Sequence, residues 1–494
     1  MLVGFMDQSS SNLEVLAISQ INSVHIKIDC DAGTAYELQD FFTFQVPGAT
    51  FMPAYRNKMW DGKIRLYNVY TKRLYAGLLP YVEEFARTRG YVLEFDESVE
   101  GAEDFSLHEA DEFSKSLNLP LRARDYQLSA FTHAVRNRRC LLLSPTASGK
   151  SLIIYHLVRW FNVKTLLIVP TTSLVHQMVT DFADYGWDAD NHCHKVMAGL
   201  DKVSDKQVIV STWQSIYKMP KEYFEQFDVV IGDEAHQFKA KSLTSIMEKL
   251  DDCKYRFGLT GTLDGAETHK LVLEGLFGAV KKVVTTSELI EKKQLSSFKI
   301  KILALRYPDD VCAEAVKYKY QEEMDFIVRY EKRNRFIRNL ALSLEGNTLL
   351  LFQFVEKHGK VLYEDICNKA GEGRKVFFVS GAVDAEARED IRKITEKEKD
   401  AIIVASYGTF STGINIRNLH NIIFASPSKS RVRNLQSIGR GLRLGDNKDE
   451  AVLFDIVDDL QWKSKKNFTL EHFIERMKIY NEEKFEYKVY RIDL

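Results

Sequence analysis

Short apolar segments recur along this chain in two series, and they constrain its fold more than any other feature. The first series is CLLLSP (140–145), TLLIVP (165–170), QVIVST (207–212), DVVIGD (228–233) and RFGLTG (256–261). Segments this short and this apolar are typical of strands buried on both faces of a parallel sheet. Helical patterns lie between them, so we predict βαβ units in a doubly wound α/β sheet that binds ligands at the carboxyl ends of its strands.

The same pattern begins again after about residue 295. The second series is TLLLFQF (348–354), KVFFVS (375–380), AIIVAS (401–406), NIIFAS (421–426) and AVLFDIV (451–457). A chain of 494 residues is also too long for one hydrophobic core. We therefore predict two similar α/β lobes in tandem, at 113–290 and 291–465.

Smaller parts flank the two predicted lobes. A small α/β module is expected at 1–112, with a strand at 24–30 and a hairpin in which 63–70 follows the turn signal Asp61-Gly62. Residues 110–120 are polar and are expected to be a connection. The tail, 466–494, is expected to form a helix followed by a short strand.

Composition excludes several classes of protein. The net charge is −1, so contacts with nucleic acid must come from local basic patches. The six cysteines are far apart and form no CxxC pair, which argues against a zinc site or a disulfide framework. The chain begins without a signal-peptide pattern, and no apolar stretch approaches the roughly 20 residues that span a membrane. We expect a soluble cytoplasmic protein with no membrane partner.

The sharpest local motif follows the first buried strand and precedes a helical stretch, which is the context that a phosphate-binding loop requires. Backbone N–H groups of such a loop, with the helix N-terminus, attract phosphate. Lys150 would reach the β- and γ-phosphates of ATP, and the Ser151 hydroxyl would hold Mg²⁺. Ser144 stands where the general pattern has its first glycine, so this is a variant loop. The motif is Ser144, Pro145, Thr146, Ala147, Ser148, Gly149, Lys150 and Ser151.

A second motif, Asp233-Glu234-Ala235-His236, follows the apolar strand DVVI. Its carboxylates should emerge at the carboxyl end of that strand, beside the phosphate loop. Mg²⁺ prefers hard oxygen ligands, so Asp233 is a candidate to hold it directly or through water. Glu234 could take a proton from an attacking water molecule. The two motifs together predict a site that hydrolyses a nucleotide.

Further motifs occur in an order that resembles the superfamily-two helicases, and this resemblance implies that both lobes are RecA-like. RDYQ (124–127) resembles the adenine-reading segment, which implicates Arg124, Tyr126 and Gln127. LTGT (259–262) resembles the motif that couples hydrolysis to movement, through Thr260 and Thr262 with His236. QSIGRGLR (436–443) resembles motif six, so Gln436, Arg440 and Arg443 are candidate catalytic residues. Arg440 and Arg443 are three residues apart on one helical face and could reach the γ-phosphate from the other lobe.

The same resemblance marks segments that contact nucleic acid. They are VPTTSLVHQM (169–178), STWQS (211–215), LLLFQFVEKHG (350–360, motif four) and ASYGTFSTGINI (405–416, motif five). Hydroxyl and amide side chains can bind phosphates without reading bases. A glycine lets the backbone approach closely, and Gly413 is expected to do so at the nucleotide. The candidate nucleic-acid contacts are Thr171, Thr172, Gln177, Thr212, Thr409, Ser411 and Thr412.

A closer resemblance is to the UvsW family of bacteriophage recombination and repair helicases. It rests on WDGKIRL (60–66), YQEE (320–323), KRN (332–334) and ASYGTFSTGI (405–414). The chain carries DEAH and LTGT where DECH-like and LSGS-like versions are expected, and these changes keep the carboxylates and hydroxyls. Within 55–75, basic and aromatic side chains alternate, so Trp60, Lys63 and Arg65 are candidate DNA contacts.

The resemblance implies an ATP-dependent DNA helicase that uses ATP and Mg²⁺ and remodels forks, junctions and R-loops in recombination, repair and replication. Its expected partners are branched or forked duplex, single-stranded DNA, RNA–DNA hybrids, and single-strand-binding or recombination proteins. If a phage encodes the chain, its location is the host cytoplasm. Two alternatives remain open at this point: a helicase for RNA or RNA–DNA hybrids, and an ATP-gated translocase or annealing subunit that does not unwind.

Overall fold

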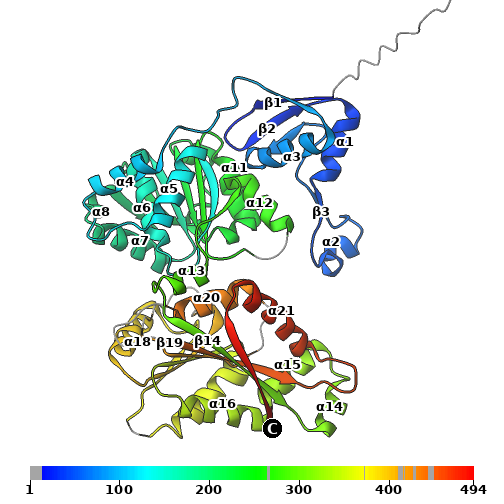
Figure 1. Cartoon of the computed structure of the whole chain (residues 1–494), viewed down its shortest axis with the longest axis vertical. Helices are drawn as coiled ribbons and strands as arrows, with labels where there is room; N and C mark the ends of the chain where they lie inside the picture. The colour runs from blue at the N-terminus through cyan, green and yellow to red at the C-terminus, as the bar shows by residue number, and fades with distance from the viewer. Residues whose placement is uncertain are drawn as a thin grey trace, which may run out of the picture.

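The computed structural model describes residues 14–197, 199–263, 267–371, 373–409, 416, 418–426, 430–442 and 450–494. Three parts follow one another along the long axis of the molecule: an N-terminal module, a first lobe and a second lobe (Figure 1). In this described part, no helix is both long and apolar enough to cross a membrane.

The first lobe is built on a seven-stranded sheet of order β13-β7-β12-β11-β8-β10-β9, in which every neighbouring pair is parallel. Its strands are β7 (Arg139–Leu143), β8 (Thr165–Val169), β9 (Cys193–Val196), β10 (Val208–Thr212), β11 (Val229–Asp233), β12 (Tyr255–Thr260) and β13 (Val280–Lys282). Its main helices are α5 (Asp125–Asn137), α6 (Lys150–Phe161), α7 (Thr172–Asp184), α11 (Lys241–Lys249) and α12 (Glu267–Phe277). Adjacent residues of one strand, such as Leu141 and Leu142, belong to different hydrophobic clusters on the two faces.

The second lobe contains another fully parallel sheet, of order β16-β17-β15-β18-β19-β14-β20. Its strands are β14 (Ser297–Arg306), β15 (Thr348–Phe352), β16 (Val376–Val379), β17 (Ile402–Ser406), β18 (Asn421–Phe424), β19 (Glu450–Asp459) and β20 (Glu486–Asp493). Its main helices are α15 (Tyr320–Arg329), α16 (Glu331–Ser343), α17 (Lys360–Cys367), α18 (Ala385–Lys397), α20 (Arg431–Gly441) and α21 (Phe468–Glu482). The predicted pair of doubly wound parallel sheets is confirmed, because both series of apolar segments form buried strands.

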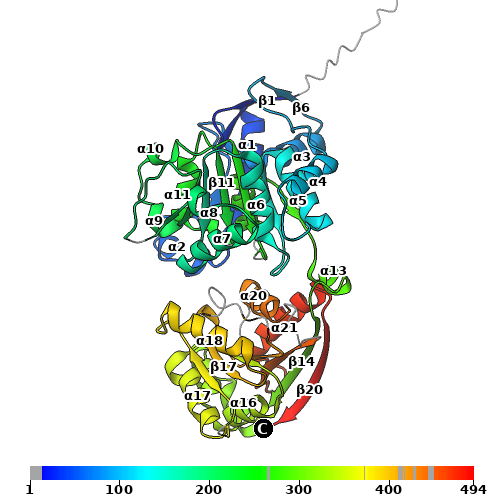
Figure 2. The same ribbon diagram turned by 90° about the vertical axis from the view of Figure 1, so that its left-hand side faces the viewer.

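The tail is part of the second sheet. Strand β20 pairs in parallel with β14 at the edge of the sheet. Helix α21 packs against β19 and buries Arg476, whose guanidinium donates to Asp455 at 2.9 Å. The short helix α13 (Thr286–Glu291) connects the two lobes (Figure 2).

The N-terminal module has a mixed four-stranded sheet of order β5-β2-β1-β6. Its strands are β1 (Val15–Gln20), β2 (His25–Asp29), β5 (Arg73–Tyr75) and β6 (Val92–Phe95). A small arm, consisting of β3 (Thr43–Gln45), α2 (Pro53–Arg56) and β4 (Lys63–Arg65), projects from the module beside the first lobe (Figure 1). The strand expected at 63–70 is therefore only β4, and its partner β3 lies across a long excursion rather than across a tight turn.

The expectation that 110–120 is a connection is wrong, because α4 (Leu107–Ser116) occupies most of it. A capping box begins this helix: the Glu109 N–H donates to the Ser106 hydroxyl, and the Glu109 carboxylate accepts from the Ser106 N–H. The Phe113 ring packs against Trp160 of α6 at 5.0 Å. The polar composition hid a helix whose stability comes from one apolar face against the first lobe.

The module is docked firmly on α12 of the first lobe. A Cβ built at Gly77 would lie 2.0 Å from the Glu274 carbonyl oxygen, so the two backbones touch. The Tyr81 hydroxyl donates to the buried Glu274 carboxylate at 2.6 Å, and the Tyr75 hydroxyl donates to Glu248 of α11 at 2.7 Å. This contact, the α12 seam, holds the module and the first lobe together as one unit.

Replacing Gly77 by Ala should destabilise this seam, because the added methyl group cannot fit against the α12 backbone. We expect a loss of about 1–3 kcal/mol in the free energy of unfolding, as for other overpacked contacts. Thermal or urea denaturation measures it. Gly101→Ala is the matched control, since a Cβ at Gly101 has no atom within 4 Å. Equal stability of the two variants would contradict the close approach.

Candidate nucleotide and nucleic-acid site

Strand order brings the nucleotide motifs to one edge of the first sheet. Strand β12 lies between β7 and β11, and all three run in the same direction. The phosphate loop after β7, the Thr260–Thr262 segment after β12 and the carboxylates after β11 therefore meet at the carboxyl ends of the strands. This is the place where open α/β sheets bind ligands.

The loop after β7 has the tight backbone that a phosphate cradle needs. Ala147 and Gly149 have positive φ angles of 67° and 80°. Ser144, at the place of the usual first glycine, is buried, and its hydroxyl lies 2.6 Å from the Ser148 hydroxyl. Its backbone N–H donates to the Thr260 carbonyl oxygen at 2.9 Å. The serine therefore fastens the loop to its own base and to the neighbouring strand.

The adenine-reading segment braces this loop from behind. The Gln127 amide donates to the Ser148 carbonyl oxygen at 3.0 Å and accepts from the Arg124 N–H at 2.8 Å. The Tyr126 hydroxyl also donates to the Ser148 carbonyl oxygen, at 2.9 Å, and the Arg124 guanidinium donates to Tyr126. In this structure these side chains position the loop, and their contact with adenine stays a prediction.

Lys150, predicted to be catalytic, and Ser151, predicted to hold Mg²⁺, follow the loop at the start of α6. The Lys150 ammonium donates to the Ser144 carbonyl oxygen at 3.3 Å, so it is held inside the loop. The Ser151 hydroxyl lies 2.9 Å from the Tyr185 hydroxyl. Ser151 must give up or share this bond in order to hold a metal ion.

Asp233 has the properties expected of a metal ligand. Its side chain is buried, and its Oδ1 atom has no hydrogen-bond partner among the described residues. Burial, with the neighbouring charge of Glu234, raises the pKa of Asp233 to about 6, and Lys150 opposes this shift. The described residues contain no cluster of three His, Cys, Asp or Glu side chains that could hold a metal. The buried Oδ1 atom of Asp233 fits Mg²⁺, which needs one or two protein oxygens and takes its other ligands from phosphate and water.

A short chain of hydrogen bonds joins the DEAH segment to the LTGT segment. The His236 Nδ1 atom lies 2.9 Å from the Thr260 hydroxyl and 3.4 Å from a Glu234 carboxylate oxygen. The Thr260 hydroxyl donates to the Thr262 carbonyl oxygen at 2.9 Å. The residues predicted to couple hydrolysis to movement are therefore in contact with the predicted general base.

The second lobe reaches the phosphate loop through α20. A Cβ built at Gly439 would lie 2.6 Å from the Thr146 Cβ, so the helix lies directly against the loop. Tyr126 and Ala147 belong to a hydrophobic cluster formed by the second lobe and the linker. A cavity of about 690 Å³ beside this contact is lined by both lobes and by the turn after α21. Sequence reasoning missed Gly439, although it lies within the motif that contains Gln436, Arg440 and Arg443.

Other predicted residues of the second lobe divide into two groups. Gln436 is half-buried on α20, and the Thr409 hydroxyl accepts from Ser406 at 2.8 Å, beyond the end of β17. Arg440 lies in α20, but its side chain is not described. The remaining predicted residues lie outside the described part of the chain. They are Ser411, Thr412, Gly413 and Arg443.

The predicted nucleic-acid contacts of the first lobe lie on one edge. Thr171 caps the N-terminus of α7 by accepting from the Leu174 N–H, and Thr172 and Gln177 are exposed on that helix. Thr212 ends β10, and its hydroxyl lies 2.9 Å from the Ser215 hydroxyl. Strands β8 and β10 are neighbours, so these segments adjoin each other.

On the arm, some candidate side chains are already bonded within the protein and others are exposed to solvent. The Trp60 indole donates to the Lys63 carbonyl oxygen at 2.8 Å, and Arg65 forms an ion pair with Asp61 at 2.5 Å. The side chains of Lys63 and Lys58 are exposed. Tyr67, which the alternating pattern included, is fully buried and serves the core.

Comparison with known proteins decides the family. The model described as "DNA helicase UvsW, N-terminal" matches residues 18–96. The ATP-dependent DNA helicase uvsW of Enterobacteria phage T4 is 38% identical over 496 residues, which is 95% of this chain and 98% of that relative. The chain belongs to the UvsW helicase family. The predicted resemblance is confirmed, and with it the prediction of an ATP-dependent helicase.

Further similarities agree with the membership in the UvsW family. The crystal structure of T4 UvsW is 36% identical and covers 97% of this chain, and the chain covers 99% of it, with a TM-score of 0.52. The model "Type III restriction enzyme, res subunit" matches 120–265, and "Helicase conserved C-terminal domain" matches 331–445.

More distant proteins share the helicase fold. The DNA 3'-5' translocase XPB2 of Sulfurisphaera tokodaii is 23% identical over 68% of this chain and 82% of its own length. The DNA-bound Type ISP restriction-modification enzyme LlaBIII, with 17% identity, a TM-score of 0.56 and coverage of 76% of this chain and 32% of its own, shows the same fold.

The raised pKa of Asp233 predicts a specific dependence of stability on pH. The unfolded carboxyl ionises near its ordinary pKa of 3.8, whereas the folded carboxyl ionises near 6. Protonated Asp233 therefore stabilises the fold at low pH, and this contribution is lost as the pH rises through about 6. We expect the free energy of unfolding of the wild type, relative to Asp233→Asn, to fall across this window and to be constant above it.

Urea denaturation at several pH values, without Mg²⁺ or nucleotide, measures the difference. Asp310→Asn is the control, since that carboxyl is exposed on another helix. A difference between wild type and Asp233→Asn that does not change with pH would show that the burial of Asp233 has no such effect.

Proposed function

We propose that this UvsW-family chain is an ATP-driven DNA helicase that unwinds or remodels branched DNA, such as forks, junctions and R-loops, in recombination, repair and replication. The observation that carries the proposal is the contact between the phosphate loop and α20. It joins the two halves of a nucleotide site across the lobes, so the state of the nucleotide and the relative position of the lobes depend on each other.

Each half of the site has its own task in hydrolysis. Lys150 and the backbone N–H groups of the loop bind phosphate oxygens. Glu234 accepts the proton of the attacking water, and Asp233 with Ser151 would hold Mg²⁺. When bound, Mg²⁺ supplies positive charge that neutralises the phosphates. Arg440 and Arg443 come from the other lobe, so hydrolysis requires closure, and such arginines are worth about 10³–10⁵ in rate.

Closure also moves the two sets of nucleic-acid contacts relative to each other. Thr171, Thr172 and Gln177 grip the backbone from the first lobe, and Thr409 with its neighbours grips it from the second. A stack of one DNA base-pair step is worth roughly 1.4 kcal/mol. Thermal fraying opens single pairs, and alternating grips driven by ATP make that opening directional.

The arm of the N-terminal module is proposed to contact duplex or junction DNA. Its exposed lysines, Lys58 and Lys63, offer charge to phosphates, and Met59, with 75% of its surface exposed, offers an apolar face beside Trp60. RNA–DNA hybrids, single-strand-binding proteins and recombination proteins stay predicted partners.

Lys150→Ala should abolish ATP hydrolysis, because the ammonium group that binds the phosphates is lost. We expect a fall of at least ~10²-fold in DNA-stimulated turnover, as for the loss of other charge-stabilising groups. Steady-state ATPase assays with single-stranded, duplex, forked and four-way-junction DNA, and with RNA, measure it. Lys254→Ala is the control, because Lys254 lies at the amino end of β12, away from the phosphate loop.

The pattern of stimulation tests the substrate. Stronger stimulation by branched DNA than by single strands supports the proposal. Stimulation mainly by RNA would instead favour an RNA helicase. Hydrolysis without strand displacement would favour an ATP-gated translocase.

Lys58→Gln combined with Lys63→Gln should weaken the binding of forked DNA about fivefold to tenfold, because two phosphate contacts are lost. ATP hydrolysis stimulated by single-stranded DNA should be unchanged, since the arm is remote from the phosphate loop. Lys27→Gln is the control, because Lys27 lies in the same module but pairs with Asp29 at 2.6 Å. Unchanged fork binding in the double variant would remove the arm from the proposal.

A further inference from the structure

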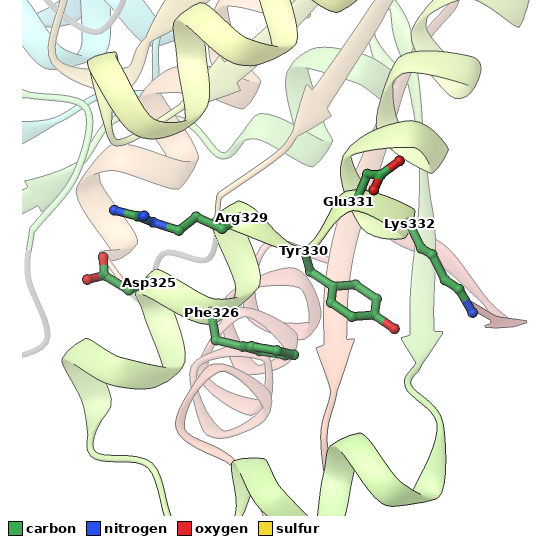
Figure 3. A pocket seen from close by; sticks show the side chains of 6 residues that line it. All are labelled: Asp325, Phe326, Arg329, Tyr330, Glu331 and Lys332. Carbon is green, nitrogen blue, oxygen red and sulfur yellow. The ribbon is translucent and has the colours of Figure 1, made fainter.

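The second lobe has a cavity that none of the helicase motifs uses. Its volume is about 710 Å³, and it lies at the elbow where Tyr330 joins α15 to α16 (Figure 3). Figure 3 shows Phe326 and Tyr330 side by side on the elbow, with Arg329 and Lys332 extending from it. The lining consists of Asp325, Phe326, Arg329, Tyr330, Glu331 and Lys332. We call this feature the elbow cavity.

The elbow cavity continues the row of nucleic-acid motifs. In a parallel sheet, the segments that follow the strands all lie at the carboxyl ends of those strands. Motif five follows β17, and motif four follows the neighbouring strand β15. Tyr307 follows β14 at the same edge, and its ring packs against Tyr330 at 4.9 Å. Asp325 forms an ion pair with Lys357 of the motif-four segment. A strand of nucleic acid that passes motif four can therefore reach the elbow.

The charge left at the cavity is positive. Both carboxylates of the lining are already engaged: Asp325 by Lys357, and Glu331 by Arg335 at 2.6 Å. Arg329 is exposed and forms no ion pair with any described residue. Its guanidinium lies near Asp325, which Lys357 already pairs, and an exposed guanidinium in this setting suits an anion such as a nucleic-acid phosphate.

The rings of the lining are suited to a base. Phe326 and Tyr330 are half-buried, with ring centroids 5.3 Å apart and ring planes tilted by 42°, so part of each ring stays accessible to solvent. Stacking of bases on such rings is worth about 1–3 kcal/mol per base and tolerates any sequence.

A buried network of hydrogen bonds holds the elbow in place. Arg333 of α16 is fully buried and donates to both carboxylate oxygens of Asp458, at 2.6 and 3.0 Å. The Tyr307 hydroxyl donates to the same carboxylate at 2.8 Å, and the Asn334 amide donates to the Val328 carbonyl oxygen at 2.8 Å. Breaking one partner of a buried pair costs several kcal/mol, so the network fixes the geometry of the elbow.

We propose that the elbow cavity is a further binding site for single-stranded DNA, which receives the strand beyond motif four. A base stacks against Phe326 and Tyr330, and a neighbouring phosphate pairs with Arg329. The site rests on the proposed function, because it extends the same path of DNA across the second lobe.

Two substitutions test the site and leave the Arg333–Asp458 pair in place. Arg329→Gln removes the free charge from an exposed position, and Phe326→Leu removes the ring while it keeps apolar volume. The control is Lys369→Gln. Lys369 is an exposed basic residue between α17 and β16, on the side of the sheet where the strands begin. Fluorescence anisotropy measures binding of a short single-stranded DNA that spans only motifs four and five, and of a longer one that extends past them.

Each variant should bind the longer strand about fivefold to tenfold more weakly than the wild type, and the short strand equally well. Arg329→Gln should also reduce the slope of log affinity against log salt concentration by roughly 0.7, the value for one phosphate contact on a single strand. Lys369→Gln should match the wild type on both strands. Equal melting temperatures exclude misfolding, and if Phe326→Leu melts early, Arg329→Gln alone decides.

The outcomes separate the two proposals. Wild-type affinity of both variants for the longer strand would overturn the elbow site and leave the helicase proposal standing. A wild-type chain that binds neither strand and shows no DNA-stimulated ATP hydrolysis would overturn both. An equal loss on short and long strands would also contradict the elbow site, since it would place the effect at the motifs themselves.

Discussion

The contact between Thr146 of the phosphate loop and Gly439 of α20 is the interaction on which the rest of the structure depends. Each lobe is built on its own seven-stranded sheet. Around this contact, side chains of α20 such as Leu435 and Ile438 line the same pocket as Pro145 and Thr146 of the first lobe. A side chain larger than hydrogen at position 439 would push the lobes apart, so the smallest residue defines how closely the motor can close.

Much of this architecture is predictable because burial of both sheet faces leaves a simple signature. The strands after which Lys150 and Asp233 emerge are short apolar runs with polar residues at their carboxyl ends, and the parallel order then places the motifs together. Helix α4 was missed because its apolar face is narrow and its exposed residues are charged. The bracing role of Gln127 was also hidden, since nothing in a sequence shows that an amide will face the back of a loop.

The second lobe shows a different limit of sequence reasoning. Arg333 and Asp458 are 125 positions apart in the chain, yet they form one buried ion pair. Arg476, Asp455 and Tyr480 form a second buried network that ties α21 to the sheet. Such pairs cost desolvation energy and are favourable only with precise geometry. Their partners can be identified only once the fold has brought them together.

The α12 seam attaches the N-terminal module rigidly to the first lobe. Gly77 and Tyr81 fix the module to α12, so the module and the first lobe form one body, which α13 joins to the second lobe. The arm lies far from α13 (Figure 1). A rotation of that body about α13 would move the tip of the arm farther than it moves the phosphate loop, and the rigid seam would transmit the movement to the arm.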